Sequence, residues 1–227
     1  MTVYLDGSYL ELTETWHVED SAWKAKNVAA MLERNRLTPA SVCDVGCGAG
    51  EIIRQLSTQF TQSRFVGYDV SPQAVDLARP READNITFKQ ADILKEDVSF
   101  DLLLAADVFE HVDDYMGFLR GLKPKATFKV FHIPLDISVM SILLGSMITT
   151  RHLVGHLHYF TKETALATLR DCGYEIIDSF HTAAFMDLPG KTLKRRIAGI
   201  PRRFFFRISP AFTAQCLGGC SLMVLAR

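Results

Sequence analysis

One short stretch restricts the fold more than any other: an apolar strand that runs into a glycine-rich loop and then into a helix. The strand is predicted at Val42–Val45, the loop at Gly46–Gly50 and the helix at Glu51–Phe60. Glycine permits a sharp turn and lets a ligand come close to the backbone at the start of the helix. The unit therefore predicts a ligand-binding loop.

An alternation of strands and helices continues along the chain. Further strands are expected at residues 64–68, 86–90, 100–105, 126–133, 174–180 and 221–225. This order predicts an α/β fold with a doubly wound, mainly parallel seven-stranded sheet and helices on both faces. Ligands of such sheets bind at the carboxyl ends of the strands. The 227 residues contain no repeat and no linker, so one domain over residues 1–227 is expected.

Acidic residues stand at the ends of the first two strands. Asp44 precedes the loop, and Asp69 ends the second strand. A carboxylate at the second position can accept hydrogen bonds from both hydroxyls of a ribose, so the loop and Asp69 together predict an adenosine-type cofactor. A nicotinamide-dependent oxidoreductase shares these features and stays an alternative, although its usual loop places the third glycine one residue later.

Four segments in order, residues 44–50, 66–71, 90–93 and 100–112, resemble the motifs of class I S-adenosylmethionine-dependent methyltransferases. The resemblance runs from Val42 to the C-terminus. It implies the Rossmann-like methyltransferase fold, S-adenosylmethionine as cofactor and a small-molecule acceptor. The cofactor-binding residues that it implies are Asp44, Gly46, Cys47, Gly48 and Gly50 for the methionine part, Asp69 and Val70 at the ribose, Asp92 and Ile93 at the adenine, and Asp107 in the same cleft.

Two of these acids also have purely structural interpretations. Asp92 could serve only as a helix cap, and Asp44 could serve only as a hydrogen-bond acceptor that stiffens the loop. A binding module that holds S-adenosylmethionine without catalysis is the alternative to an enzyme.

Histidines are the candidates for a general base, because methylation of a hydroxyl or amine releases a proton and imidazole titrates near neutrality. His111, His156 and His158 are the catalytic candidates, and His132 in the fifth strand is a further one. Their number favours a hydroxyl oxygen as acceptor. In relatives, an acid–histidine pair such as Glu110-His111 can be part of a divalent metal site, and packing against the cofactor loop is the structural alternative.

The five cysteines indicate a reducing compartment. Their number is odd, no leader follows Met1, and a cytoplasmic location is expected. Cys43 with Cys47 and Cys216 with Cys220 could form a zinc site, but the first pair brackets the glycine loop. No metal site is therefore expected.

Three segments lie outside the motifs. Residues 1–40 are expected to form a helical lead-in that can fold over the cofactor, with Trp16 and Trp23 on one face and His17 and Glu19 as candidate contacts for the acceptor. Residues 135–160 are expected to form an irregular lid or a wall of the acceptor pocket, which favours a small organic or lipid-like acceptor. An extra core helix is the alternative there. Residues 188–227 hold a basic segment and the last strand.

The charge is nearly balanced, with 25 basic and 26 acidic side chains, which argues against a general nucleic-acid binder. It is uneven along the chain, since Asp187 is the last acid and eight basic residues follow it. Cations and aromatics mix over residues 191–207, so this segment could make peripheral contact with an anionic membrane or a lipid-linked acceptor, or it could form a solvated helix followed by a loop. The apolar runs at 137–150 and 208–226 are too short or too interrupted to span a membrane. The sequence indicates no oligomeric state.

Overall fold

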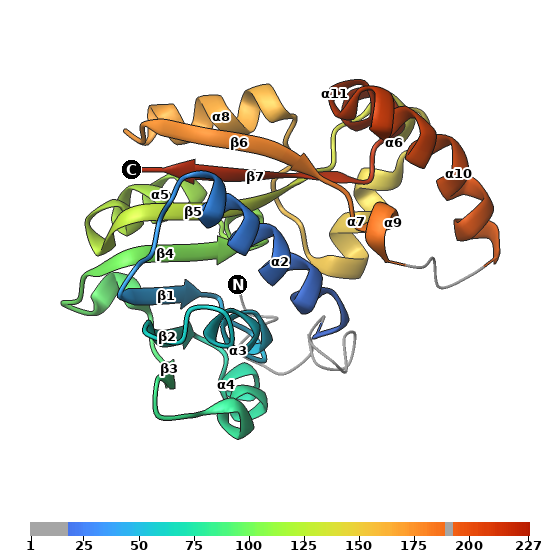
Figure 1. The fold of residues 1–227 in the computed structure, drawn as a ribbon. Helices are drawn as coiled ribbons and strands as arrows, with labels where there is room; N and C mark the ends of the chain where they lie inside the picture. Colours follow the sequence, from blue (N-terminus) through green and yellow to red (C-terminus); the bar gives the residue numbers. More distant parts are fainter. Residues whose placement is uncertain (1–17, 189–192) are drawn as a thin grey trace.

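A seven-stranded sheet forms the centre of the molecule in the computed structural model, which describes residues 18–188 and 193–227 (Figure 1). The strand order is β3-β2-β1-β4-β5-β7-β6, and β7 runs antiparallel to its neighbours β5 and β6. The predicted sheet, including its last strand, is confirmed. The strands are β1 (Ser41–Val45), β2 (Arg64–Asp69), β3 (Ile86–Gln90), β4 (Phe100–Ala106), β5 (Ala126–Leu135), β6 (Ile176–Thr182) and β7 (Cys220–Ala226).

Helices cover both faces of this sheet. Buried side chains of α2 (Val18–Arg34), α3 (Glu51–Ser57) and α4 (Pro72–Ala78) pack in one apolar cluster, and those of α5 (Tyr115–Leu122) and α8 (Lys162–Asp171) pack in another. In β1, Val42 faces the first cluster and Cys43 faces the second. A strand that is buried on both faces is mostly apolar, which explains why the sequence of β1 does not alternate regularly between apolar and polar residues.

Local signals fix where the helices begin. Ser71 caps α4 by accepting a hydrogen bond from the backbone N–H of Ala74 at 3.4 Å, and Pro72 occupies the first helical position. Thr161 caps α8 through a capping box with Thr164. The short 3-10 turn η4 (Phe109–His111) follows β4 and leads toward α5.

The strands β1, β2 and β3 are added toward one edge of the sheet, and β4 then follows on the other side of β1. β1 and β4 are thus neighbours in space but not in sequence. In open α/β sheets such a switch point leaves a crevice at the carboxyl ends of the two strands. The loops after β1 and β4 therefore flank the crevice in which a ligand is expected.

The segment at 135–160 is not irregular as expected. It contains α6 (Val139–Leu143) and α7 (Ser146–Val154), because Ser138 caps α6 and glycines in the left-handed conformation bound α7. Neither helix buries any of its residues, so the alternative of an extra core helix is wrong.

The C-terminal part adds α9 (Ala184–Asp187), α10 (Leu193–Ile208), α11 (Pro210–Phe212) and the π-turn η6 (Thr213–Leu217). Figure 1 shows α6, α10 and α11 gathered at one end of the molecule. No helix in the described part of the chain is long and apolar enough to cross a membrane. Trp16 and His17 of the lead-in, like residues 191 and 192 of the basic segment, lie outside the described residues.

Candidate active site

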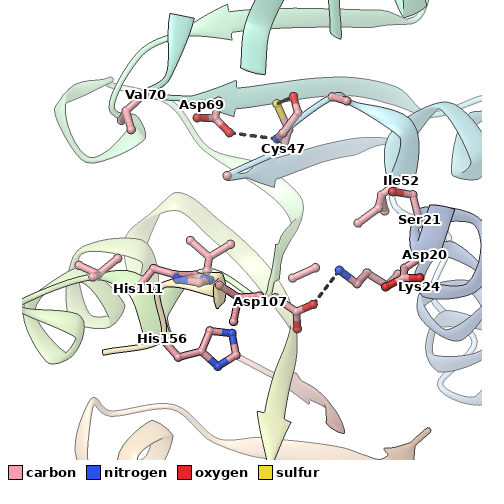
Figure 2. A pocket seen from close by; sticks show the side chains of 17 residues that line it. Asp20, Ser21, Lys24, Cys47, Ile52, Asp69, Val70, Asp107, His111 and His156 are labelled. Atoms are coloured by element: carbon pink, nitrogen blue, oxygen red, sulfur yellow. Dashed lines mark hydrogen bonds and ion pairs between the residues drawn. The ribbon is translucent and has the colours of Figure 1, made fainter. Parts of the chain in front are cut away.

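A pocket of about 350 Å³ opens where the loops after β1 and β4 meet (Figure 2). Eight of the predicted site residues line it: Gly46, Cys47, Gly48, Asp69, Val70, Asp107, His111 and His156. The other five predicted residues do not line it: Asp44, Gly50, Asp92, Ile93 and His158. Helix α2 adds Asp20, Ser21 and Lys24, for which the sequence suggested no role.

The glycine loop wraps the end of β2. The backbone N–H groups of Gly46 and Cys47 donate to the carbonyl oxygen of Tyr68 at 2.8 and 3.1 Å. Gly46 and Gly50 have φ angles of 68° and 75°, and a Cβ on Gly50 would lie 2.3 Å from the ring of Phe88. Gly50 therefore lets the loop pack closely against β3, while Gly46 and Gly48 line the pocket.

Asp69 is held in place by the loop that it faces. One carboxylate oxygen accepts from the N–H of Gly48 at 2.9 Å and the other from the N–H of Ser71 at 2.9 Å. Burial raises the pKa of Asp69, although these N–H donors work against the shift. The carboxylate keeps further lone pairs toward the pocket, where ribose hydroxyls could donate.

Asp44 lies directly beneath the loop and is 1% exposed. Its Oδ2 has no hydrogen-bond partner among the described residues. Burial, together with the nearby charge of Asp69, raises the pKa of Asp44 to about 7. A buried carboxylate oxygen without a partner is costly, and a cationic ligand above the loop would relieve that cost.

Asp92 caps a short 3-10 turn at residues 93–95. Its Oδ1 accepts from the N–H of Leu94 at 3.0 Å, and its Oδ2 lies 3.6 Å from Nζ of Lys95. The side chain of Ile93 is buried in the core. These contacts are those of a helix cap, the structural alternative for Asp92, and its role at an adenine stays a prediction.

Asp107 joins three elements at the rim of the pocket. Its carboxylate contacts Nζ of Lys24 at 2.7 Å and Nδ1 of His132 at 2.6 Å, and its φ of 56° is unusual for a residue other than glycine. Burial favours the neutral acid, but the charges of His132 and Lys24 outweigh it and lower the pKa of Asp107. His132 also contacts Thr182 Oγ1 through Nε2 at 3.0 Å, so both ring nitrogens bind the protein.

His156 and His111 lie together on the opposite wall (Figure 2). Nδ1 of His156 donates to the Asp136 carboxylate at 2.6 Å, which leaves the lone pair on Nε2. Nδ1 of His111 donates to the carbonyl oxygen of Gly155 at 3.1 Å. Burial, with a smaller contribution from His156, lowers the pKa of His111 to about 4, so its ring is neutral at physiological pH.

His158 has a different environment. Its Nε2 donates to the carbonyl oxygen of Val112 at 3.0 Å, and its ring packs on Tyr115 at 4.3 Å between centroids. Of the three predicted catalytic histidines, the structure thus brings two together at the pocket. Asp136, which sequence reasoning missed, is the partner of one of them; its only sequence signal is its position at the end of the fifth strand.

Glu110 completes a buried group beside the two histidines. Neither of its carboxylate oxygens has a hydrogen-bond partner within the described ranges, and burial raises its pKa well above the usual value. One ligand atom each from Glu110, His111 and His156 lies within 4.8 Å of the others, the one such group of three in the described part of the chain. This group could hold a divalent cation.

The residues at the pocket fit S-adenosylmethionine. Asp69 and the backbone of the glycine loop line the same pocket, where the carboxylate could accept hydrogen bonds from ribose hydroxyls, and the unpartnered oxygen of Asp44 suits a ligand that carries positive charge.

Comparison with known proteins points to the same cofactor. The family described as "Methyltransferase domain" matches residues 39–164, which is more than half of the chain. Trans-aconitate 2-methyltransferase of Deinococcus radiodurans is 35% identical over 83 residues, covering 37% of this chain and 32% of the relative. Demethylmenaquinone methyltransferase of the same organism is 33% identical over 102 residues, covering 42% and 41%. The chain thus matches less than half of the length of these two curated relatives.

Solved structures agree on the fold. Magnesium protoporphyrin IX methyltransferase from Synechocystis PCC 6803, with bound SAH, aligns with a TM-score of 0.61 at 16% identity, covering 91% of this chain and 82% of that one.

The family match excludes the alternative of a nicotinamide-dependent oxidoreductase, because the matched segment contains the loop and both acids on which that alternative rested. The chain therefore belongs to the class I S-adenosylmethionine-dependent methyltransferases.

Proposed function

We propose that the protein transfers a methyl group from S-adenosylmethionine to a hydroxyl oxygen of a small organic acceptor, with His156 as the general base. One observation carries the proposal: His156, oriented by Asp136, lines the same pocket as the glycine loop and Asp69. A base at this position is close to where the cofactor-binding loop presents a ligand.

His156 is the best base of the three candidates. The low pKa of His111, about 4, makes that ring a weak proton acceptor. His158 does not line the pocket and its Nε2 is engaged by Val112. The Asp136 carboxylate fixes the tautomer of His156 and stabilises the imidazolium that forms when Nε2 takes a proton.

S-adenosylmethionine, when bound, supplies an electrophilic methyl group on a sulfonium sulfur and leaves as S-adenosylhomocysteine. The protein's residues align the acceptor oxygen for in-line attack and keep water out of the pocket. As the acceptor O–H proton moves to Nε2 of His156, the oxygen lone pair forms the new bond to carbon. The proton leaves later to solvent.

The acceptor class follows from the surroundings of the pocket. Val112 and Val154 line its histidine side, and α7 next to them exposes apolar side chains. These residues favour an organic or lipid-like molecule over a highly charged one. The two relatives, named for trans-aconitate and demethylmenaquinone, support a small-molecule acceptor without specifying which. We also propose that the protein acts in the cytoplasm.

The test measures S-adenosylhomocysteine formation with a panel of hydroxylated acceptors, from water-soluble phenols and hydroxy acids to isoprenoid phenols. We expect turnover with at least one acceptor in the wild type and a loss of about 10²–10⁴-fold in kcat for His156→Gln. His158→Gln is the matched control, since it removes an imidazole two residues away that does not line the pocket. Tight cofactor binding with no turnover on any acceptor would favour the non-catalytic binding module.

A further inference from the structure

Among the residues whose side chains the structure describes, the large exposed apolar ones are concentrated on two segments that are far apart in sequence. Thirteen large apolar residues are exposed in the described part of the chain, and all except Ile177 lie at 139–153 or 200–212. The most exposed are Leu143 (74%), Leu144 (70%), Ile208 (66%) and Ile200 (64%). Single exposed apolar residues are ordinary, but a contiguous group of them marks a binding surface.

The two segments belong to one part of the fold. Helix α6 packs against η6, which α10 and α11 also contact, and α7 packs against α6. The contact between α6 and the end of η6 is close, because a Cβ on Gly218 would lie 2.7 Å from Oγ of Ser138. Figure 1 shows the helices at the same end of the molecule. We call the exposed apolar residues of α6, α7, α10 and α11 the apolar face.

The helical pattern of α10 is that of a helix lying on a surface. Ile200, Phe204 and Ile208 follow one another at four-residue spacing and are exposed, so they form a stripe. Phe206 points elsewhere and packs against Phe185 of α9, with ring centroids 5.9 Å apart. The helix is thus anchored to the protein on one side and leaves apolar rings outward on another.

The helices that carry the apolar face, α6, α7, α10 and α11, together contain basic residues but no acidic ones. The sequence contains no Asp or Glu between Asp136 and Glu163, nor anywhere after Asp187. Arg151 on α7 and Arg203 and Arg207 on α10 are exposed among the apolar residues. A soluble protein partner would not require the charges on these helices to be all positive, whereas an anionic bilayer attracts them and accepts the apolar side chains between its headgroups.

We infer that the apolar face docks the enzyme on an anionic lipid bilayer, from which a lipid-like acceptor enters the pocket. The entry of a lipid-like acceptor rests on the proposed function, whereas the docking on the bilayer does not depend on it. Val154, the last residue of α7, lines the pocket, so the face begins where the pocket opens. An acceptor with its tail in the bilayer could thus reach the histidine wall along α7.

The test is co-sedimentation of the full chain with vesicles of phosphatidylcholine alone and with added phosphatidylglycerol. We expect binding to the anionic vesicles, weakened by salt, and a loss of about tenfold or more for the double variants Leu143→Ser/Leu144→Ser and Phe204→Ser/Ile208→Ser. Arg151→Gln and Arg207→Gln should each weaken binding roughly fivefold on anionic vesicles alone. Ile177→Ser, at the exposed apolar position outside the face, is the matched control.

Equal sedimentation of the wild type with both vesicle types, or of the face variants and the control, would overturn the inference. So would sedimentation or dimer formation without lipid that the face variants abolish, because the face would then bind a second copy. Titration of each variant with S-adenosylhomocysteine checks that the pocket is folded. Vesicle binding requires no acceptor, so a failure of docking and a failure of methyl transfer are read separately.

Discussion

The carboxylate of Asp136 lies 2.6 Å from Nδ1 of His156, and this pair links the end of β5 to the segment after α7. The backbone of η4 holds the same segment, since the carbonyl oxygen of Glu110 accepts from the N–H groups of Leu157 and His158 at 2.8 and 3.1 Å. The candidate base is thus positioned by the segments that follow β4 and β5.

Replacing Asp136 by Asn should lower kcat and leave KM for the cofactor unchanged. The amide keeps the size of the side chain but loses the charge that stabilises the imidazolium of His156, and we expect a loss of about 100-fold. Steady-state kinetics at saturating cofactor measure it. Asp113→Asn, an exposed acid nearby, is the control, and equal kcat values for the two variants would remove Asp136 from the mechanism.

Cofactor binding should depend on the protonation of Asp44. Its pKa of about 7 in the free protein means that Asp44 is protonated at lower pH, and a cationic ligand favours the ionised form. Affinity should therefore weaken up to about tenfold per pH unit below 7. The free energy of unfolding of the free protein should change in the opposite direction. Because the pKa of Asp44 is raised in the folded state, the protonated side chain favours folding at low pH, and this contribution is lost as the pH rises from about 4 through 7.

Calorimetric titrations with S-adenosylmethionine compare the wild type with Asp44→Asn between pH 5.5 and 8, a range that includes the pKa of Asp44. The variant should bind more weakly at pH 8 and lose most of the pH dependence. A pH profile identical to that of the wild type would show that another group titrates.

Gly50→Ala should destabilise the protein much more than Gly145→Ala. Both glycines have positive φ angles, of 75° and 61°, so each substitution strains the backbone by about 1–2 kcal/mol. Only at Gly50 would the new Cβ lie 2.3 Å from Phe88, while nothing lies within 4 Å at Gly145. We expect about 2 kcal/mol of additional loss at Gly50 in urea unfolding. Equal losses would mean that the loop can shift away from β3.

Chelation of divalent cations should leave the rate of methyl transfer unchanged, because the His156–Asp136 pair supplies the base. The experiment compares turnover with and without a chelator, and with Mg²⁺ or Mn²⁺ added back. A loss that either ion restores would assign Glu110, His111 and His156 to a cation, since these three already lie within 4.8 Å of one another. His156 could not then be the base.

The sheet and the glycine loop were predictable from the sequence because both follow from local rules. Residues 42–45 form a strand buried on both faces, and such strands are mostly apolar, here with Asp44 as the one charged residue. The loop after β1 needs glycines at positive φ, and Asp69 at the end of β2 accepts a hydrogen bond from this loop. These residues therefore form a recognisable sequence pattern within 30 residues. The motif residues at the pocket rim could be identified for that reason.

Contacts between distant segments leave no such pattern. Lys24 reaches Asp107 from α2, and Asp136 reaches His156 across 20 residues, yet neither pair has a spacing that a helix or strand would impose. For the segment at 135–160 the sequence did not indicate α6 and α7, and the alternative of a core helix was wrong because these helices expose their apolar side chains. Apolar residues at a surface that binds another phase look in sequence like core residues.

Titration with S-adenosylhomocysteine of the wild type and Asp69→Ala tests the central claim, that the loop after β1 and the acids at neighbouring strand ends bind the adenosyl cofactor. The account predicts saturable binding by the wild type and a loss of roughly 1–3 kcal/mol in the variant, because a charged hydrogen-bond acceptor at the ribose is removed. The absence of binding by the wild type, or an unchanged affinity after the substitution, would contradict it.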